Sequence, residues 1–580
     1  MNKDVSRRGA ENAENAENSQ ILFVPSASSA PLREMLLFFF LLVSGAPAAD
    51  TPPGYAVASA HPLATAAGIE ILEQGGTAFD AAVAVSAVLA VVEPQSSGIG
   101  GGGFWLLHRE ADGFETMVDG RETAPLAATA NMYLDAKGVA DPKASRDGPK
   151  SAAIPGAPAA WVHLAQKYGS KPLVQLLAPA IRLARDGFAA DAKLALAIQE
   201  SGARLSPAAA TTFAAGAPIR QPELAALLEA LGRDGRSAFY EGEFADRLVA
   251  GANAAGGVWA VEDLRRYRVI ERKPMQGYYR DYRITAPPPP SAGGIALAEA
   301  LTMLEARAWP PASPVQARHL LAEVMRRVFR DRNLLGDPAF VPIPLYRLAS
   351  REYLLGLARG IDAGAATPSD ALPTPGEGSN TTHFSILDAH GNRVAGTQTI
   401  NTSFGSGFMP PGTGVLLNNE MDDFAASATA SNAYGLVGSA ANVIAPGKRP
   451  LSSMSPTFVE GPRGLLILGT PGGSRIISMV LEGVLAFTEG AGAQQLVAQP
   501  RYHHQYQPDQ IDFEPEALSA EDQAGLSALG HRLRAVAAYG NMQAVWWDKA
   551  NDGLEAASDP RGAGAGQVRR LRPPPKAAPQ

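Results

Sequence analysis

Hydrophobic residues recur alternately at helical and at strand spacing along most of the chain, a pattern typical of the α/β (α+β) class. After Pro62 the run from Leu63 to Gln74 has helical spacing, and the pair Gly75–Gly76 ends it. The run from Asp80 to Val92 is apolar on every side, which predicts a helix buried in a large core.

Short apolar runs bounded by glycines predict strands. Phe104 to Leu107 reads as one strand, and a turn at Asp112–Gly113 leads to a second strand that ends near Val118. The stretch 155–370 is mostly helical in pattern. Near the C-terminal end, a strand over Gly464 to Leu468 leads through a glycine-rich turn to a helix from Arg475.

The stretch 371–379 is rich in Pro and Gly, so it is expected to be a loop. A strand, a turn and a second strand follow it, over Thr382 to Asp388 and Arg393 to Ile400. If the turn centres on His390, antiparallel pairing sets residue 381 opposite residue 399. The pattern therefore predicts one threonine at the start of a strand, facing another threonine.

Both ends of the chain differ from the middle. Residues 1–34 are polar, and Arg33 precedes an apolar run from Met35 to Val43 and the small residues Ala46–Pro47–Ala48. This order is typical of a secretory signal, so residues 1–49 are expected to be an extension and signal of an exported, periplasmic or extracellular protein. A buried strand, or a true start at Met35, are the alternatives. From about residue 563 the composition predicts a loose tail.

Composition excludes several classes of function. The chain has 580 residues, 46% of them hydrophobic, a formal net charge of −7 and no cysteine. An acidic chain without a basic stripe does not suit nucleic acid. The lack of cysteine excludes disulfides, thiolate metal sites and cysteine nucleophiles, and it suits an oxidising compartment.

The loop that ends in Asn380–Thr381 can carry chemistry. A threonine hydroxyl is a weak nucleophile unless a base lies beside it. If the bond between these residues is cut, the new α-amino group has an ordinary pKa of about 7.7–8.0 and can act as that base. The same hydroxyl could make the cut by attacking the Asn380 carbonyl. By itself, however, this dipeptide favours an ordinary strand start with β-branched residues over a nucleophile.

Two further features belong to this hypothesis. Thr399 could hold the Thr381 hydroxyl by a hydrogen bond, although Thr–Thr pairs are common across strands. Gly472–Gly473 lies between a predicted strand and a predicted helix, where two backbone N–H groups could stabilise an oxyanion. The alternative is a tight turn that needs glycine, and a phosphate-binding loop is excluded because no Gly-Lys-Ser/Thr follows.

Several segments in this order resemble the γ-glutamyltransferase (γ-glutamyltranspeptidase, glutathione hydrolase) family, and the likeness runs from about residue 55 to about 562. They are the segments Val92 to Phe104, Arg121 to Pro125, Asn380 to Ser385, Leu416 to Phe424, Lys448 to Thr457 and Pro471 to Arg475. The resemblance implies an N-terminal-nucleophile αββα sandwich. It also implies that one precursor cuts itself into a large subunit, residues 50–380, and a small catalytic subunit, residues 381–580.

The resemblance also implies the role of each site residue. Thr381 would be the nucleophile, Thr399 its support, and Gly472 with Gly473 the oxyanion hole. The donor's α-ammonium would be bound by Asn401, Glu420 and Asp423, and its α-carboxylate by Arg121, Ser452 and Ser453. An ammonium needs acceptors and a carboxylate needs donors, so this division is chemically consistent. Tyr434 would be the lid over the donor.

The implied reaction is two acyl transfers through a γ-glutamyl-threonine ester, from glutathione or a similar donor to water, an amino acid or a peptide. No cofactor and no metal are expected, since the adjacent His503 and His504 would point to opposite faces of a strand. His383 and Ser385 are expected to pack or hydrogen-bond rather than catalyse. The alternatives are a cephalosporin or glutaryl acylase, a poly-γ-glutamate depolymerase, or an unprocessed binding protein.

Overall fold

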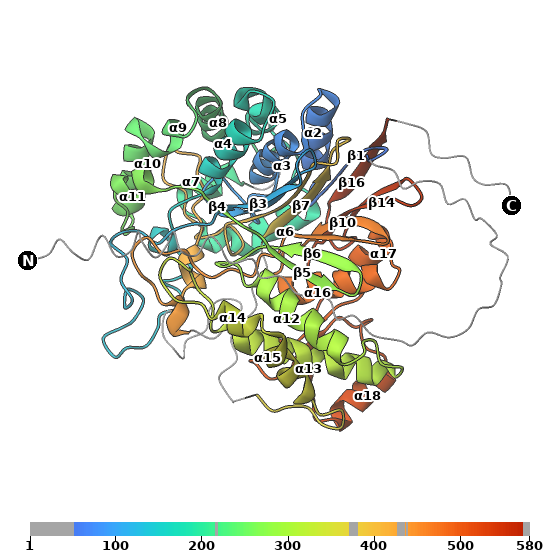
Figure 1. Ribbon diagram of the computed structural model, residues 1–580. Helices are drawn as coiled ribbons and strands as arrows, with labels where there is room; N and C mark the ends of the chain where they lie inside the picture. Colours follow the sequence, from blue (N-terminus) through green and yellow to red (C-terminus); the bar gives the residue numbers. More distant parts are fainter. Residues whose placement is uncertain (1–50, 215–217, 370–380, 426–435, 437–438, 572–580) are drawn as a thin grey trace, which may run out of the picture. The chain divides into compact units, whose positions relative to one another are not determined.

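Two antiparallel β-sheets lie face to face at the centre of the unit that runs from Pro47 to Gln580 (Figure 1). The computed structural model describes residues 51–214, 218–369, 381–425, 436 and 439–571. The predicted signal segment, the loop before Thr381 with Asn380, and Tyr434 lie outside these residues.

The first sheet has seven strands, and every neighbouring pair is antiparallel. Its order is β16 (Ala565–Arg570), β1 (Gly54–Ser59), β7 (Thr382–Leu387), β8 (Arg393–Thr399), β2 (Gly102–Arg109), β3 (Phe114–Gly120) and β4 (Ile270–Arg272). The strands that follow Thr381 therefore lie between strands from the start of the chain.

The second sheet has six antiparallel strands. Its order is β15 (Gly553–Ser558), β14 (Gln543–Asp548), β10 (Gly464–Gly469), β9 (Thr457–Gly461), β6 (Tyr282–Ala286) and β5 (Met275–Tyr279). A small third sheet contains β11 (Tyr502–His503), β12 (Ile511–Phe513) and β13 (Leu533–Ala535). Both large sheets thus combine strands from before and after Thr381.

Helices cover the outer face of each large sheet (Figure 1). Over the first sheet lie α2 (Pro62–Glu73), α3 (Ala78–Val92), α4 (Ala157–Lys167), α5 (Leu173–Asp186) and α8 (Pro222–Asp234), with the smaller α6 (Ala192–Ser201), α7 (Pro207–Thr212), α9 (Ser237–Tyr240), α10 (Gly242–Ala254) and α11 (Val261–Arg266) on the same side. Over the second lie α12 (Gly293–Ala306), α13 (Pro314–Arg332), α14 (Leu345–Leu348), α15 (Arg351–Arg359), α16 (Arg475–Thr488), α17 (Ala493–Ala498) and α18 (Ala520–Ala528).

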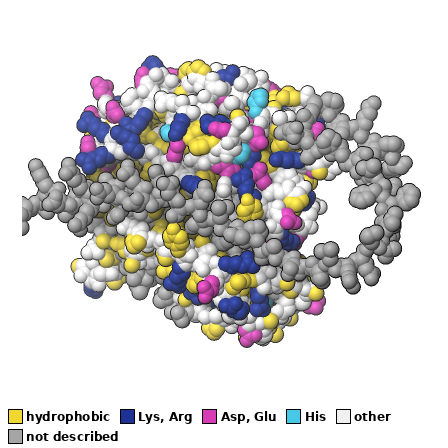
Figure 2. All heavy atoms as spheres, viewed as in Figure 1, with side chains coloured by type: hydrophobic (Ala, Val, Ile, Leu, Met, Phe, Trp, Pro, Cys, Tyr) yellow, Lys and Arg dark blue, Asp and Glu magenta, His cyan; other side chains and the backbone are white. Residues whose placement is uncertain are grey.

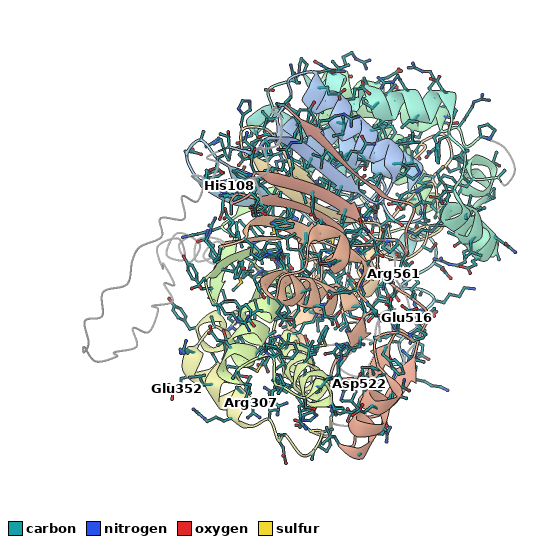
Figure 3. The ribbon with its side chains drawn as sticks, turned by 90° about the vertical axis from the view of Figure 1, so that its right-hand side faces the viewer. His108, Arg307, Glu352, Glu516, Asp522 and Arg561 are labelled. Carbon is teal, nitrogen blue, oxygen red and sulfur yellow. The ribbon has the colours of Figure 1, made fainter. Side chains whose placement is uncertain are left out.

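Alternation along the strands creates two separate apolar layers. In β2, Trp105 and Leu107 pack with the first helical layer, whereas Phe104 and Leu106 face the second sheet. This period of two is what a strand buried on both faces requires. The predicted αββα sandwich is confirmed. Figure 3 shows the same order of layers after a 90° turn, with His108 on the first sheet and Arg307, Glu352 and Asp522 on the second helical layer.

Helix α3 is the central support of the first sheet. All its residues are buried, as its all-round apolar sequence predicts, and the Trp105 indole N–H donates to Ser86 Oγ on this helix at 3.0 Å. Thr77 and Asp80 form a capping box at its start. Within the described residues, no helix has the length and apolarity that a bilayer span needs.

The sheets correct one expectation and add short strands to a stretch that is mostly helical, as predicted. The predicted loose tail is wrong for Ala565–Arg570, because β16 pairs with β1 over six residue pairs and covers an edge of the first sheet that would otherwise be open. The stretch 155–370 also contains strands β4 to β6, which are too short and too polar to stand out within a mainly helical pattern. β5 and β6 form a hairpin, while β4 pairs with β3 and β6 with β9, which are distant in sequence.

The surface charge is mixed in sign. On the face shown in Figure 2, Lys and Arg side chains lie among Asp and Glu side chains. The formal net charge of the whole chain is −7.

Candidate active site

The register between β7 and β8 brings Thr381 and Thr399 together. Thr382 is paired with Gln398, so Thr381, the residue before β7, comes opposite Thr399 at the end of β8. The two Oγ1 atoms lie 3.2 Å apart and both side chains are buried. The predicted pairing of residues 381 and 399 is confirmed.

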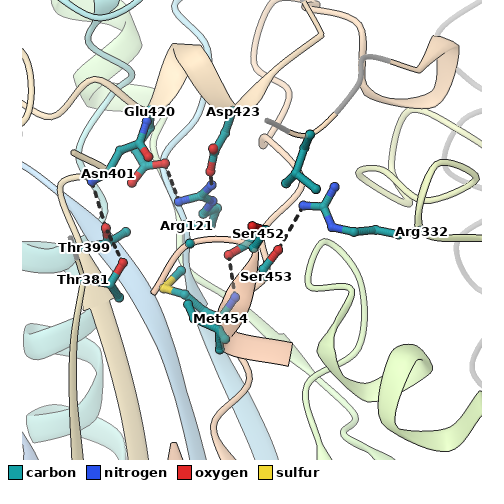
Figure 4. A pocket seen from close by; sticks show the side chains of 14 residues that line it. Arg121, Arg332, Thr381, Thr399, Asn401, Glu420, Asp423, Ser452, Ser453 and Met454 are labelled. Atoms are coloured by element: carbon teal, nitrogen blue, oxygen red, sulfur yellow. Dashed lines mark hydrogen bonds and ion pairs between the residues drawn. The ribbon is translucent and has the colours of Figure 1, made fainter. Parts of the chain in front are cut away.

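The backbone after β8 favours one direction for the hydrogen bond between the two threonine hydroxyls. Asn401, in the left-handed region with φ of 77°, donates its backbone N–H to Thr399 Oγ1 at 2.8 Å. Because Thr399 Oγ1 already accepts this bond, the arrangement favours donation of the Thr399 hydroxyl hydrogen to Thr381 Oγ1. Figure 4 shows this row of three residues at one side of a pocket.

Gly472 and Gly473 lie in the turn between β10 and α16, as the sequence predicts. Their φ angles are 145° and 57°, values that residues other than glycine rarely adopt. Gly473 and its neighbour Ser474 line the same pocket as Thr381. The glycine turn therefore approaches the threonine pair from the second sheet.

The pocket has a volume of about 310 Å³, including space open to solvent, and it gathers most of the predicted site residues (Figure 4). Those that line it are Thr381, Thr399, Asn401, Glu420, Asp423, Arg121, Ser452, Ser453 and Gly473. They come from segments as far apart as residues 121 and 473, so the fold assembles them. The role of each stays a prediction at this point.

Arg121 lies at the centre of a buried ion-pair network. Its Nη1 is 2.6 Å from Glu420 Oε2 and 3.3 Å from Glu122 Oε2, and its Nη2 is 2.5 Å from Asp423 Oδ2. Burial alone lowers the pKa of Arg121, but these carboxylates reverse that and raise it. The predicted carboxylate-binding arginine and the predicted ammonium-binding acids thus contact each other directly.

Burial also changes the acids of this network. It raises the pKa of Glu420 well above its ordinary value, against the opposing effect of Arg121. It raises the pKa of Glu122 to about 7 in the same way. Burial therefore disfavours the charged form of both acids, and Arg121 offsets only part of that effect.

The hydroxyls of Ser452 and Ser453 both accept hydrogen bonds from groups that can only donate. Met454 N–H donates to Ser452 Oγ at 3.1 Å, and Arg332 Nη2 donates to Ser453 Oγ at 3.1 Å. Each serine therefore keeps its own hydroxyl hydrogen for another acceptor. Two hydroxyl donors beside two guanidinium groups suit a carboxylate.

Arg332 was not predicted. It is the last residue of α13, lines the pocket and is buried. The sequence offered little signal, because α13 carries several arginines and those at 326 and 327 are buried in ion pairs with Glu323 instead. Only the tertiary structure distinguishes the arginine that faces the pocket.

His383 and Ser385 lie away from the pocket, between the two sheets. His383 contacts Thr397 Oγ1 at 2.8 Å and Ser385 Oγ at 3.3 Å, and burial lowers its pKa to about 3. A neutral histidine in this place packs and hydrogen-bonds, as expected. On the other strand face Thr382 donates to Glu93 Oε2 at 2.7 Å, which fixes the start of β7.

A second cluster of possible ligands lies outside the pocket. One ligand atom each of His319, Glu323 and His531 lie within 4.8 Å of one another, and all three residues are buried. His319 Nδ1 contacts His531 Nε2 at 2.7 Å, and Glu323 is paired with Arg326 and Arg327. The histidine contact joins α13 to the segment after α18, and Glu323 pairs with arginines of its own helix. His503, expected to be no metal ligand, is buried with a pKa lowered to about 3.

A sandwich of this kind, with a threonine at the start of a central strand, defines the class of N-terminal-nucleophile hydrolases. The family described as Gamma-glutamyltranspeptidase matches residues 64–568, and the chain belongs to this family. Of three proteins that resemble it, two are named glutathione hydrolase proenzymes and the third is named a cephalosporin acylase.

The chain is 39% identical over 525 residues to the glutathione hydrolase proenzyme of Escherichia coli (strain K12), covering 87% of this chain and 90% of that protein. It is 41% identical over 539 residues to the glutathione hydrolase proenzyme of Pseudomonas aeruginosa, covering 90% and 95%. The crystal structure of cephalosporin acylase from Bacillus halodurans superposes with a TM-score of 0.78 at 27% identity, covering 94% of this chain and 99% of that one.

Proposed function

We propose that this protein is a self-processing glutathione hydrolase and γ-glutamyltransferase. The observation that carries the proposal is the Thr381 hydroxyl, bonded to Thr399 Oγ1 in a pocket that also contains Arg121 and two carboxylates. The relatives from Escherichia coli and Pseudomonas aeruginosa, both named glutathione hydrolase proenzymes, support it.

Processing is a cut between Asn380 and Thr381. The Thr381 hydroxyl attacks the Asn380 carbonyl, and the peptide C–N bond breaks to leave an ester and a free α-amino group. Water then hydrolyses the ester, which releases the Asn380 carboxylate and restores the hydroxyl. It yields a large subunit, residues 50–380, and a small subunit, residues 381–580. Both sheets contain strands from both segments, and β1 lies between β16 and β7. The two subunits therefore stay together after the cut, because separation would expose the cores of both sheets.

In the catalytic cycle, Thr381 Oγ1 attacks the γ-amide carbon of the donor while the α-amino group of Thr381 takes the hydroxyl proton. The N–H groups of Gly472 and Gly473 stabilise the resulting oxyanion. Collapse breaks the C–N bond, returns the proton to the leaving amine and forms a γ-glutamyl ester on Thr381. Water or the amine of an amino acid or peptide then attacks the ester and regenerates the hydroxyl.

The pocket binds both charged groups of the donor's amino-acid end, the α-ammonium and the α-carboxylate. Asn401, Glu420 and Asp423 bind the α-ammonium, and Arg121, Ser452 and Ser453 bind the α-carboxylate. A donor that lacks either group leaves buried charges unpaired, so it is strongly disfavoured. Tyr434, which lies outside the described residues, closes over the donor in this proposal.

The same scaffold also suits an acylase, since the Bacillus halodurans structure is a cephalosporin acylase. Glu420 and Asp423 favour the γ-glutamyl reading, because a glutaryl group has no α-ammonium for these acids to bind. Their carboxylates lie 2.6 and 2.5 Å from Arg121 at the pocket. A glutaryl donor would bring the carboxylate but no ammonium to pair with these two acids.

The test is the hydrolysis of glutathione and of γ-glutamyl-p-nitroanilide, compared with glutaryl-p-nitroanilide, by the purified protein. We expect glutamate and cysteinylglycine from glutathione, faster p-nitroaniline release from the γ-glutamyl donor, and a γ-glutamyl dipeptide when glycylglycine is added. Faster turnover of the glutaryl donor would favour the acylase instead. No turnover of either would favour an unprocessed binding protein.

Export is a further part of the proposal. It is supported by Arg33, the apolar run from Met35 to Val43 and the small residues that follow, and by the absence of cysteine. N-terminal sequencing of the large subunit purified from its native cells tests it. A start shortly after Ala48 is expected, and a large subunit that begins at Met1 would contradict it.

A further inference from the structure

Arg332 brings a second guanidinium to the pocket, from the end of α13 (Figure 4). Its residue is 7% exposed, and its Nη2 donates to Ser453 Oγ at 3.1 Å. Among the residues that the structure describes, no carboxylate oxygen lies within 4.0 Å of Arg332, and its buried Nε has no hydrogen-bond partner. A buried cation of this kind is costly unless a bound anion compensates it.

Arg121 differs in this respect. Three carboxylates already contact its guanidinium, from Glu122, Glu420 and Asp423. Its charge is therefore matched before any ligand binds. An anionic ligand that entered the pocket would find Arg121 balanced and Arg332 without a direct ion pair. The positive charge that the pocket still offers is that of Arg332.

Burial disfavours the charge of this group. It lowers the pKa of Arg332 to about 10, with Asp423 opposing the shift and Arg121 adding to it. The group remains a cation at neutral pH, but it is held in a place that disfavours its charge. An anion bound nearby would remove much of this penalty.

Ser453 connects this charge to the ligand. Arginine only donates, so Ser453 Oγ accepts from Arg332 and its hydroxyl hydrogen points elsewhere. A hydroxyl that accepts from a cation is a stronger donor. Ser452, bonded in the same way by the Met454 N–H, lies beside it. Both hydroxyls can then donate to one carboxylate.

We propose that Arg332 is a specificity-determining positioning residue, which adds a second cation to that of Arg121 for the donor's α-carboxylate and orients Ser453 to donate to it. This inference rests on the proposed γ-glutamyl function. A purely structural role is the alternative, because a cation at the C-terminal end of a helix is itself stabilising. The two differ in whether the effect of Arg332 depends on the carboxylate.

The test compares two donors that differ only in that group, γ-glutamyl-p-nitroanilide and 4-aminobutanoyl-p-nitroanilide. Wild type, Arg332→Met and Arg332→Lys are measured with enzyme in excess, so that the slow truncated donor is still turned over. We expect Arg332→Met to lower kcat/KM about 10- to 100-fold on the γ-glutamyl donor and less than about threefold on the truncated donor. Arg332→Lys, which keeps the charge, should fall between.

Arg330→Met is the matched control, since Arg330 lies on the same helix with its side chain 42% exposed. This variant should leave kcat/KM unchanged for both donors. A second readout uses the Ser453→Ala variant as the background. There, Arg332→Met should lower kcat/KM for the γ-glutamyl donor by a smaller factor than it does in the wild type, because part of its effect passes through Ser453.

The inference would be overturned if Arg332→Met, or a processed Arg332→Lys enzyme, lost kcat/KM by the same factor on both donors. Should Arg332→Met not be processed into subunits on a denaturing gel, Arg332→Lys decides. Failure of the proposed function looks different, since the wild type would then hydrolyse neither donor.

Discussion

Thr381 Oγ1 lies 3.2 Å from Thr399 Oγ1, and Thr399 Oγ1 in turn accepts the backbone N–H of Asn401 at 2.8 Å. The ladder between β7 and β8 fixes the first distance, because the two threonines extend the pairing of Thr382 with Gln398. The pair therefore depends on a central strand pair and not on a loop. A sheet holds such a contact with little conformational freedom, which suits a hydroxyl that must attack its substrate in a fixed orientation.

Removal of the Thr399 hydroxyl should slow both self-processing and turnover. Thr399→Ala removes the donor that orients Thr381 Oγ1, so we expect kcat for γ-glutamyl-p-nitroanilide to fall about 10- to 1000-fold. Thr399→Ser keeps the hydroxyl and should stay within about tenfold of the wild type. Steady-state kinetics and the rate of precursor disappearance on gels measure the two effects.

Thr397→Val is the matched control for Thr399. It lies two residues away on β8 and removes the partner of His383 Nδ1 between the sheets. We expect a loss of about 1–3 kcal/mol in stability with kcat preserved. A Thr399→Ala enzyme with wild-type kcat would contradict the orientation argument.

Substitution of Gly472 should impair the acyl-transfer step. An alanine there would adopt φ of 145° only under strain of about 1–3 kcal/mol, and the turn that approaches the threonine pair would move. We expect kcat for the γ-glutamyl donor to fall about 100- to 1000-fold, with a smaller change in KM.

Gly490→Ala separates strain from site geometry. Gly490 has φ of 114° in the turn after α16, and a Cβ there would meet no atom within 4 Å. It should lower the melting temperature and leave kcat unchanged. If it lowers kcat as much as Gly472→Ala does, the loss reflects stability and not the oxyanion site.

Glu482 on α16 should make the stability of the protein depend on pH. Burial raises its pKa from 4.5 to about 8, and its Oε2 has no hydrogen-bond partner among the described residues. The folded protein thus keeps a proton that the unfolded chain releases, and stability falls as pH rises from about 4.5 through about 8.

Glu482→Gln removes this proton linkage. Its melting temperature, relative to that of the wild type, should rise from pH 5 to pH 8.5, by an amount equivalent to roughly a few kcal/mol. Glu489→Gln, an exposed change at the end of the same helix, is the control. If the melting-temperature difference between Glu482→Gln and the wild type is the same at both pH values, Glu482 does not keep its proton on folding.

Strand β16 should be essential although it lies near the C-terminus. Deletion of residues 565–580 would open β1 along its whole length, so we expect a lower melting temperature and impaired processing. Deletion of residues 572–580 alone keeps the strand and serves as the control. Equal stability of the two truncated proteins would contradict a structural role for β16.

The parts that the sequence predicts are those with local signals. The hairpin after residue 381 has a turn that sets its register, and Gly472–Gly473 lies between a clear strand and a clear helix. β16 was missed because its glycine- and arginine-rich sequence resembles a tail, and its partner β1 lies at the other end of the chain. Arg332 was missed because only the fold distinguishes it from other arginines of α13.

The central claim is that Thr381 becomes an N-terminal nucleophile by self-cleavage. The most direct test is intact-mass and N-terminal-sequence analysis of the purified wild type beside Thr381→Ala. The account predicts a wild-type fragment that begins Thr381-Thr382-His383, and a Thr381→Ala chain that stays whole. A wild type that remains uncut after prolonged incubation, or a mutant that is cut at the same bond, would contradict it.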